Sequence, residues 1–275
     1  MSEASALPEL VREKLKALAA VERCRIILAV ESGSRAWGFP SADSDYDVRF
    51  LYVRPKEWYL SIDEGRDVIE RPLDDAAIDL AGWDLKKALK LLRKSNPPLL
   101  EWLQSPIIYL EDTTIPRKLR EIMRKIYAPK SCMYHYFHMA QGNYKEYLRG
   151  ETVRVKKYFY VMRPVLACRW IESGNGPVPM EFSRLVDAVL PDGPVKDEVE
   201  RLVAEKQLSV ELDSGRRRPI LNEFLEAELA RFSRWRETDE RPSVHTEALN
   251  KLFREALLEV WGNGEDHALE TRTER

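Results

Sequence analysis

The stretch that decides the fold covers residues 26–52 and reads IILAVESGSRAWGFPSADSDYDVRFLY. Its apolar start, residues 26–30, predicts a buried strand that ends at a small-residue turn around Gly33 and Ser34. We expect a short helix from Ser34 to about Trp37 to follow this turn. Free backbone N–H groups and the positive end of a helix dipole attract anions. The turn therefore predicts a cradle for a phosphate group.

The end of the same stretch carries two carboxylates. Asp45, Asp47 and Arg49 share one face of a second strand, because successive side chains of a strand point to opposite faces. Two like charges on one face repel each other, and a divalent cation between them turns that cost into a gain. An Asp-x-Asp pair alone also fits a solvated turn, but the phosphate cradle before it favours a site for a metal-bound nucleoside triphosphate. The opposite face is apolar and carries Tyr46, Val48, Phe50 and Tyr52.

The pattern Gly33-Ser34, ten residues, Asp45-Tyr46-Asp47-Val48 resembles the signature of the DNA polymerase β-type nucleotidyltransferase superfamily. The longer strings GSRAWGFPSADSDYDVRFLYV and GWDLKKALKLLRKSNPPLLEWLQSPIIY resemble a subgroup of predicted nucleotidyltransferases. That subgroup includes proteins associated with an RNA-repair pathway. The similarity runs from about residue 25 to about residue 190 and covers most of the chain.

This resemblance implies an activity and the residues that perform it. A nucleoside monophosphate would pass from a nucleoside triphosphate to an acceptor hydroxyl, with two Mg²⁺ (or Mn²⁺) ions held by carboxylates. Asp45 and Asp47 would hold the metals, and the triphosphate-binding residues would be Gly33, Ser34 and Arg35. The superfamily also needs a third carboxylate on a later strand.

The third carboxylate is expected within residues 67–81, which read as two strands around a tight turn. Asp79 stands between two apolar residues, which is the context that the resemblance requires. Asp74 and Asp75 have a simpler explanation as turn residues. Asp84 directly precedes an amphipathic helix and is expected to be its N-cap. We therefore assign Asp79 as the third metal-binding and catalytic carboxylate, with Asp75 and Asp84 as the next candidates.

A basic segment follows the carboxylates in the chain. Residues 113–171 hold 13 Lys and Arg against 3 Asp and Glu, although the whole chain has a net charge of −2. Lys156, Tyr160 and Arg163 are spaced to share one face of a helix expected over residues 152–173. An aromatic ring between cations suits stacking on a base while the cations hold phosphates. The residues expected to bind nucleotide, RNA or both are thus Lys156, Lys157, Tyr160 and Arg163.

The basic side chains of residues 114–130 fit an ordinary solvated helix face equally well. Elsewhere the composition is that of a globular protein, with 44% hydrophobic and 33% charged residues. Cys24, Cys132 and Cys168 lie far apart in apolar segments, so we expect reduced core residues rather than a zinc site or disulfides. The sequence shows no apolar run long enough to span a membrane and no signal peptide. We expect a cytoplasmic protein, and the oligomeric state stays open.

The order of elements predicts an α+β fold. Strands are expected near residues 24–32, 46–54, 67–73 and 76–81, with a short fifth strand at 107–110. From residue 115 onward the periodicity is helical almost throughout. We therefore expect a small mixed α/β nucleotidyltransferase domain over residues 1–112 and an all-helical domain over residues 113–262. Residues 263–275 have few apolar side chains and are expected to be disordered.

The acceptor is the least determined part of this hypothesis. The basic segment and the resemblance favour a hydroxyl of RNA, bound in the cleft between the two expected domains. Within the same chemistry the acceptor could be a protein side chain or a small molecule. A protein of a different class, a non-catalytic module that binds nucleotide or RNA, is the remaining alternative. The presence of all three carboxylates argues against such a loss of activity.

Overall fold

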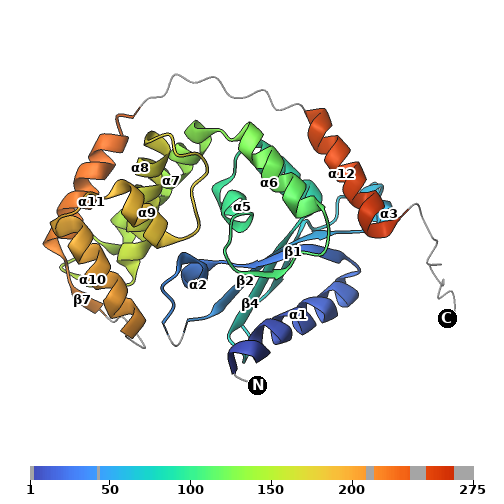
Figure 1. Cartoon of the computed structure of the whole chain (residues 1–275), viewed down its shortest axis with the longest axis horizontal. Helices are drawn as coiled ribbons and strands as arrows, with labels where there is room; N and C mark the ends of the chain where they lie inside the picture. Colours follow the sequence, from blue (N-terminus) through green and yellow to red (C-terminus); the bar gives the residue numbers. More distant parts are fainter. Residues whose placement is uncertain (1–2, 42–43, 209–213, 236–245, 263–275) are drawn as a thin grey trace.

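The computed structural model describes residues 3–41, 44–208, 214–235 and 246–262. Its centre is a five-stranded sheet in the order β3-β4-β2-β1-β5 (Figure 1). β2 and β4 run parallel, and the other neighbouring strands are antiparallel. The predicted α+β class is confirmed, and so is each predicted strand, within one to three residues at its ends. The strands are β1 (Arg25–Glu31), β2 (Tyr46–Val53), β3 (Val68–Arg71), β4 (Ile78–Asp84) and β5 (Ile108–Leu110).

Helices cover both faces of the sheet. α1 lies along one face, and α4, α5 and α6 lie along the other (Figure 1). The helices before residue 128 are α1 (Glu3–Glu22), α2 (Gly33–Trp37), α3 (Lys56–Tyr59), α4 (Leu85–Arg93), α5 (Pro97–Trp102) and α6 (Ile115–Ile126). Those after it are α7 (Pro129–Tyr147), α8 (Lys157–Glu172), α9 (Phe182–Val189), α10 (Pro194–Leu208), α11 (Pro219–Phe232) and α12 (Thr246–Trp261).

The side chains of β2 pack into two separate hydrophobic clusters, one on each face of the sheet. Val48, Phe50 and Tyr52 pack with α1 on one side of the sheet. Leu51 and Val53 pack with the helices on the other side. The alternation expected for a strand is present, but both faces are covered. Asp47 and Arg49 consequently lie on the same face as Leu51 and Val53, the side of α4, α5 and α6, at the start of the strand.

The second half of the chain is mostly helical but contains two short strands. β6 (Thr152–Arg154) pairs antiparallel with β7 (Ser214–Arg216). The helix expected from residue 152 therefore begins only at Lys157. The physical reason lies in the alternation of Val153 and Val155, which are 2% and 7% exposed while the residues between and before them face solvent. β-branched residues in period-two alternation favour a strand.

The sheet and the later helices share one core. Ile115 and Leu119 of α6 pack in the same cluster as Leu28 of β1. α12, far along the chain, lies against α4, α6 and β2 (Figure 1). Lys118 of α6 forms an ion pair with Glu255 of α12 at 2.8 Å. The domain boundary near residue 112 stays a prediction. α6 and α12 follow this residue in the chain, yet they pack against strands of the sheet. The segment 263–275 lies outside the described residues.

The cysteines have the environment that was predicted. Cys24, Cys132 and Cys168 are buried and carry free thiols. Burial raises the pKa of the Cys24 thiol to about 11 and that of the Cys132 thiol to about 12. These thiols therefore stay protonated at neutral pH and serve as small apolar core residues.

Candidate active site

The parallel pairing of β2 and β4 brings two of the predicted carboxylates together. Asp47 of β2 stands directly opposite Asp79 of β4 in the register. Neighbouring strands lie roughly 4.8 Å apart, so these two side chains on one face are neighbours. Asp45 lies two residues earlier, immediately before β2. The register thus places Asp79, 32 residues further along the chain, beside the Asp-x-Asp pair.

Arg49 joins the two carboxylates. Its guanidinium donates to Asp47 Oδ1 at 2.9 Å and to Asp79 Oδ2 at 2.8 Å. It also donates to the carbonyl oxygen of Asp79 at 3.3 Å. The Arg49 side chain is 19% exposed, against 34% for Asp47 and 32% for Asp79. The strand pattern predicted that Arg49 shares the carboxylate face, but it gave no sign that one arginine pairs with both acids.

The electrostatics of Asp47 reflect this crowding. Burial is the largest cause of a raised pKa for its carboxyl group. The positive charge of Arg49 lowers that pKa, whereas the negative charges of Asp79 and Asp45 raise it. The charges of Asp45 and Asp79 therefore act on Asp47, and the positive charge of Arg49 offsets part of their repulsion.

Gly33 is fitted to the Asp47 carboxylate. Its φ is +62°, a conformation that glycine adopts readily. A Cβ built at this position would lie 2.0 Å from Asp47 Oδ2, which no real side chain permits. The short helix predicted after the turn is present as α2, which begins at Gly33. The turn and the carboxylate therefore form one site, because the backbone of Gly33 lies directly against Asp47.

Hydroxyl groups connect the turn to the later helices. Ser34 Oγ donates to Ser44 Oγ at 3.1 Å, and Ser44 Oγ lies 3.0 Å from Ser41 Oγ. Lys206 of α10 donates to Ser41 Oγ at 2.8 Å. Sequence reasoning missed Lys206, since no local pattern could bring α10 to this loop. A cation thus stands at the end of the chain of hydroxyls that begins at Ser34.

Arg35, another predicted triphosphate ligand, is engaged with the protein itself. Its guanidinium lies 3.7 Å from the centre of the Tyr46 ring. It also donates to the carbonyl oxygens of Ser44 at 2.6 Å and Asp45 at 3.2 Å. Arg35 therefore holds the loop that leads into β2, and its positive charge remains at the rim of the site.

A buried acid, Glu31, holds the backbone of Asp47. Glu31 ends β1, is fully buried, and accepts a hydrogen bond from the backbone N–H of Asp47 at 2.8 Å. Its other carboxyl oxygen accepts from Tyr109 at 2.5 Å. Burial raises the pKa of Glu31 to about 7, against the lowering effect of the Tyr109 hydrogen bond. Sequence reasoning missed this residue, although a glutamate at the end of the apolar run 26–30 was a visible signal.

Helix α8 places some of the predicted basic and aromatic residues near this end of the sheet. Tyr160 is 44% exposed and lies 6.2 Å, ring to ring, from Trp37 of α2. Partial burial and then the negative charge of Asp47 raise the pKa of Tyr160. Lys157 stands between the rings of Tyr147 and Tyr160, at 4.2 and 4.5 Å from their centres. Tyr160 therefore lies within electrostatic reach of Asp47, with Lys157 against its ring. Lys156 directly precedes Lys157 at the start of α8.

Arg163 is buried, unlike the accessible cation expected in the cleft, and its guanidinium lies 5.1 Å from the centre of the Trp37 ring. Its side chain is 5% exposed and forms an ion pair with Glu101 at 2.8 Å. It also donates to the carbonyl oxygens of Pro179 and Met180. The physical reason is that α7, α9 and α11 all pack on α8, so that nearly every face of this helix is buried. Arg163 is therefore a core residue, and a contact of its side chain with a ligand stays a prediction.

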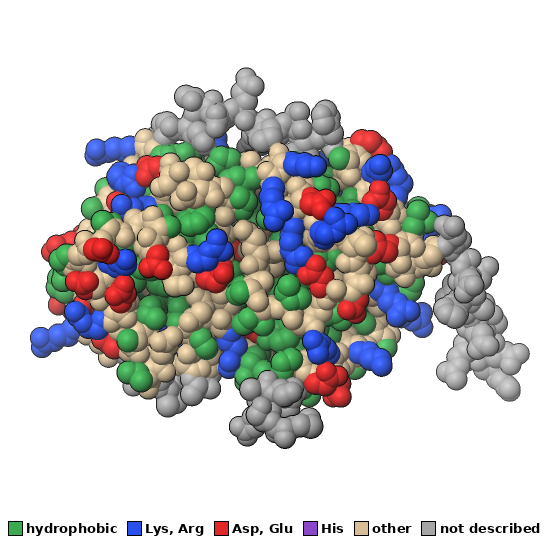
Figure 2. Space-filling model, in the orientation of Figure 1, with side chains coloured by type: hydrophobic (Ala, Val, Ile, Leu, Met, Phe, Trp, Pro, Cys, Tyr) green, Lys and Arg blue, Asp and Glu red, His purple; other side chains and the backbone are tan. Residues whose placement is uncertain are grey.

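The basic helix α6 fits the solvated-face interpretation. Acidic side chains stand among the Lys and Arg side chains over α6 (Figure 2). Arg117 pairs with Glu121 at 2.6 Å, and Arg120 pairs with Glu111 at 2.5 Å. Ion pairs of this kind, together with that of Lys118, offset much of the local positive charge.

The competing acids have the structural roles that their context predicts. Asp74 Oδ1 accepts from the backbone N–H groups of Ala76 at 2.9 Å and Ile78 at 3.0 Å, as a turn residue does. Asp84 accepts from the N–H of Lys86 at 2.8 Å and caps α4. Asp84 also stands five residues beyond Asp79 on β4, or roughly 17 Å along the strand. Neither acid therefore joins the Asp47 and Asp79 pair.

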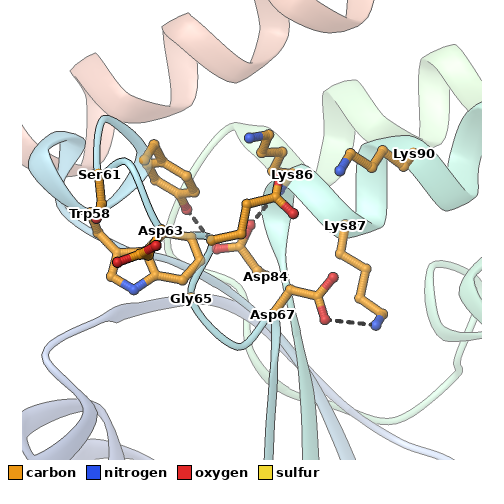
Figure 3. Close-up of a pocket in the computed structure, with 11 residues that line it drawn as sticks. Trp58, Ser61, Asp63, Gly65, Asp67, Asp84, Lys86, Lys87 and Lys90 are labelled. Atoms are coloured by element: carbon orange, nitrogen blue, oxygen red, sulfur yellow. Dashed lines mark hydrogen bonds and ion pairs between the residues drawn. The ribbon is translucent and has the colours of Figure 1, made fainter.

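A pocket lies at that far end of β4, around Asp84 (Figure 3). Lys87 on its rim forms an ion pair with Asp67 at 2.9 Å. Charges of both signs line it, namely Asp63, Glu64, Asp67, Asp84, Lys86, Lys87 and Lys90. This pocket is therefore a different site from the carboxylate pair: it lies far from Asp79 along β4, and its acidic side chains stand beside lysines.

Residues 7–255 match the model of the RlaP family, described as "RNA repair pathway DNA polymerase beta family". The chain belongs to this family. It is 46% identical over 253 residues to the protein called "Uncharacterized protein YcgL" of Bacillus subtilis (strain 168), covering 92% of this chain and 97% of that one. A solved structure, a nucleotidyltransferase-like protein from Exiguobacterium sibiricum 255-15, is similar with a TM-score of 0.32 and 13% identity, covering 92% and 89% of the two chains.

Membership in the RlaP family confirms the resemblance carried by the Gly33–Val48 motif. It makes the chain a DNA polymerase β-type nucleotidyltransferase-like protein linked to RNA repair. Within the described residues, no helix combines the length and the apolar character that a membrane crossing requires.

Members of the DNA polymerase β superfamily are typically metal-dependent, so the fit of the residues to a metal matters. Asp45, Asp47 and Asp79 offer carboxylate oxygens, the donors that Mg²⁺ and Mn²⁺ prefer. The residues therefore fit these ions in kind. In the part of the chain that the structure describes, no three acidic, histidine or cysteine side chains are arranged to hold an ion together. Arg49 takes up one oxygen of Asp47 and one of Asp79 instead.

Proposed function

We propose that this protein transfers a nucleoside monophosphate from a nucleoside triphosphate to an acceptor hydroxyl, and that the acceptor is RNA. Family membership supports the reaction class and the link to RNA repair. The observation that carries the proposal is the contact of the Gly33 turn with Asp47, beside Asp79 on the neighbouring parallel strand. A phosphate bound at the turn would meet the carboxylates immediately.

The turn residues would hold the triphosphate. Backbone N–H groups at Gly33 and the hydroxyl of Ser34 are suited to phosphate oxygens. Ser34 would exchange its hydrogen bond to Ser44 for one to the nucleotide. Arg35 would contribute charge from the rim without leaving the loop, since its guanidinium stacks on Tyr46.

Asp45, Asp47 and Asp79 would hold the divalent cations. When bound, such ions stabilise negative charge on the transferred phosphoryl group and lower the pKa of the attacking hydroxyl. The acceptor oxygen forms a bond to the α-phosphorus, and the bond from that phosphorus to the bridging oxygen breaks to release pyrophosphate. The hydroxyl proton passes to a carboxylate of the site, for which we propose Asp79.

The acceptor would approach from the α8 side. Tyr160 offers an exposed ring next to Trp37, which suits stacking on a base. Lys156 and Lys157 lie at the start of the same helix and would hold phosphates of the nucleotide or of RNA. Two neighbouring lysines beside an exposed ring favour an RNA acceptor over a small molecule.

Label transfer tests the function directly. The protein is incubated with Mg²⁺, total RNA and each nucleoside triphosphate, labelled with ³²P at either the α or the γ position. We expect label on RNA from the α position only, together with release of pyrophosphate. Label on the protein itself or on a small molecule would replace RNA as the acceptor. Nucleotide binding without any α-label transfer would overturn the catalytic proposal in favour of a binding module.

A further inference from the structure

Arg49 stands where a cation is expected. Its guanidinium takes Oδ1 of Asp47 at 2.9 Å and Oδ2 of Asp79 at 2.8 Å. The other oxygen of Asp47, Oδ2, lies against Gly33 and so faces the turn. Arg49 therefore neutralises part of the negative charge of the pair and leaves one oxygen of Asp47 directed toward the nucleotide side.

Charge counting gives this arrangement a consequence. Asp47 and Asp79 carry two negative charges, and Arg49 supplies one positive charge in contact with both. A divalent cation that arrives alone meets a pair that is already half neutralised and must accept repulsion from the guanidinium. A cation that arrives on a triphosphate brings its own negative oxygens, which Arg49 attracts rather than repels.

We propose that Arg49 is an internal counter-ion that weakens divalent-cation binding at Asp47 and Asp79, so that the cation enters as its complex with the nucleotide. This inference rests on the proposed function for the identity of the site. It makes Arg49 a positioning residue, acting through the carboxylates. Cation and nucleotide then raise each other's affinity by the same factor, because coupled binding free energies must be equal in both directions.

The sign of the effect separates this role from simple orientation. An adjacent cation weakens proton binding to a carboxylate by about one to three powers of ten. Removal of Arg49 should therefore tighten cation binding. If Arg49 only orients its neighbours, its removal should weaken cation binding, as loss of a supporting hydrogen bond around a metal site does, by roughly 10- to 100-fold.

Mn²⁺ binding without nucleotide tests the proposal, read from the electron paramagnetic resonance signal of free Mn²⁺. We expect Arg49→Met to bind Mn²⁺ roughly tenfold more tightly than the parent protein, or better. Arg49→Lys keeps the charge and should stay close to the parent. Arg54→Met is the matched control, because Arg54 directly follows β2 and is ion-paired to Glu22, away from the carboxylate pair. The tightening should vanish in the double variant Asp47→Asn, Arg49→Met.

Unchanged or weaker Mn²⁺ binding by Arg49→Met would overturn the proposal. If this variant is less stable, the rise in melting temperature caused by Mn²⁺ gives the same comparison, since a ligand of the folded state stabilises it according to its affinity. Neither readout needs turnover. A protein that transfers no nucleotide but binds Mn²⁺ more tightly without Arg49 would contradict the proposed function and support this inference.

Discussion

Side-chain spacing predicts a ligand-binding face on both β2 and α8, but only β2 presents its predicted residues on one accessible face. Asp47 and Asp79 are about one-third exposed, at 34% and 32%, whereas Arg163 of α8 is 5% exposed. All three side chains are charged and ion-paired. The difference lies in what surrounds them: Asp47 and Asp79 stand at the ends of strands, and Arg163 stands in the middle of a helix packed on several sides.

Spacing in the sequence therefore predicts an accessible face more reliably for a strand than for a helix. In a strand, alternation alone decides which residues share a face. In a helix, spacing decides which residues are neighbours, but exposure depends on how many other helices pack against it. For α8 these are the two neighbouring helices, α7 and α9, and the more distant α11. A charged residue on such a helix then pairs with an acid that is itself largely shielded from solvent, as Arg163 does with Glu101.

The largest effect is expected from substitution of the strand carboxylates Asp47 and Asp79. Asp47→Asn and Asp79→Asn should each lower α-label transfer by roughly three powers of ten or more, because residues that act as one catalytic unit are lost together. Each isostere should leave the fold intact at a partly exposed strand end. Asp192→Asn, at a side chain that is 96% exposed, is the control. Full activity of either Asn variant would remove that residue from the catalytic set.

On α8, by contrast, substitution of Arg163 should lower the stability of the protein rather than its affinity for nucleotide. Arg163→Met leaves the largely buried Glu101, whose side chain is 14% exposed, without its cation, and loss of one member of a buried pair costs up to about 3–5 kcal/mol. Denaturant unfolding measures this loss. Adding Glu101→Gln to the same protein should restore part of it. A stable Arg163→Met protein with weakened nucleotide binding would instead support a contact of Arg163 with the ligand.

How far the sequence could predict the fold depends on the range of the interactions. The strand near residues 24–32 was predicted from a continuous apolar run that ends at a breaker, and the strand near 46–54 from the alternation of its side chains. Thr152 to Val155 has a similar alternation and forms β6, but its partner β7 lies about 60 residues later. A three-residue strand depends on such a partner for its existence. The pattern alone was therefore outweighed by the helical periodicity that follows it.

The residues of the candidate site also fall into those that a local pattern predicts and those that depend on contacts distant in the chain. The motif predicted Gly33 beside Asp47 and the strand context predicted Asp79, since both depend on local pattern and on the resemblance. Glu31 and Lys206 were missed, because their roles depend on contacts with β2 and with the loop before it. The double ion pair of Arg49 also depends on the β2–β4 register, which no local pattern specifies.

Gly33 offers a test of whether the turn and the carboxylate act as one site. Gly33→Ala and Gly174→Ala both place a side chain at positive φ, +62° and +71°, and each should lose about 1–2 kcal/mol of stability from the backbone alone. Only at Gly33 would the new Cβ also meet Asp47 Oδ2. Nucleotide transfer should therefore fall at least roughly tenfold in Gly33→Ala and stay unchanged in Gly174→Ala. Equal activities would separate the turn from the carboxylates.

The smallest expected effect concerns the basic start of α8, the part of that helix that remains in the candidate site. Each phosphate contact with single-stranded RNA contributes about 0.7 to the slope of log affinity against log salt. Lys156→Ala should reduce the slope by about that amount. Lys157→Ala should reduce it less, because the rings of Tyr147 and Tyr160 already hold that ammonium.

Lys125→Ala, at an exposed position on α6, is the matched control and should leave the slope unchanged. Filter binding of a labelled single-stranded RNA over a range of salt concentrations measures all three slopes. If Lys125→Ala alone reduces the slope, the RNA path runs over α6 and away from α8. If none of the three variants changes it, the cations of both helices are ordinary solvated charges, and a protein or small-molecule acceptor replaces RNA in the proposed reaction.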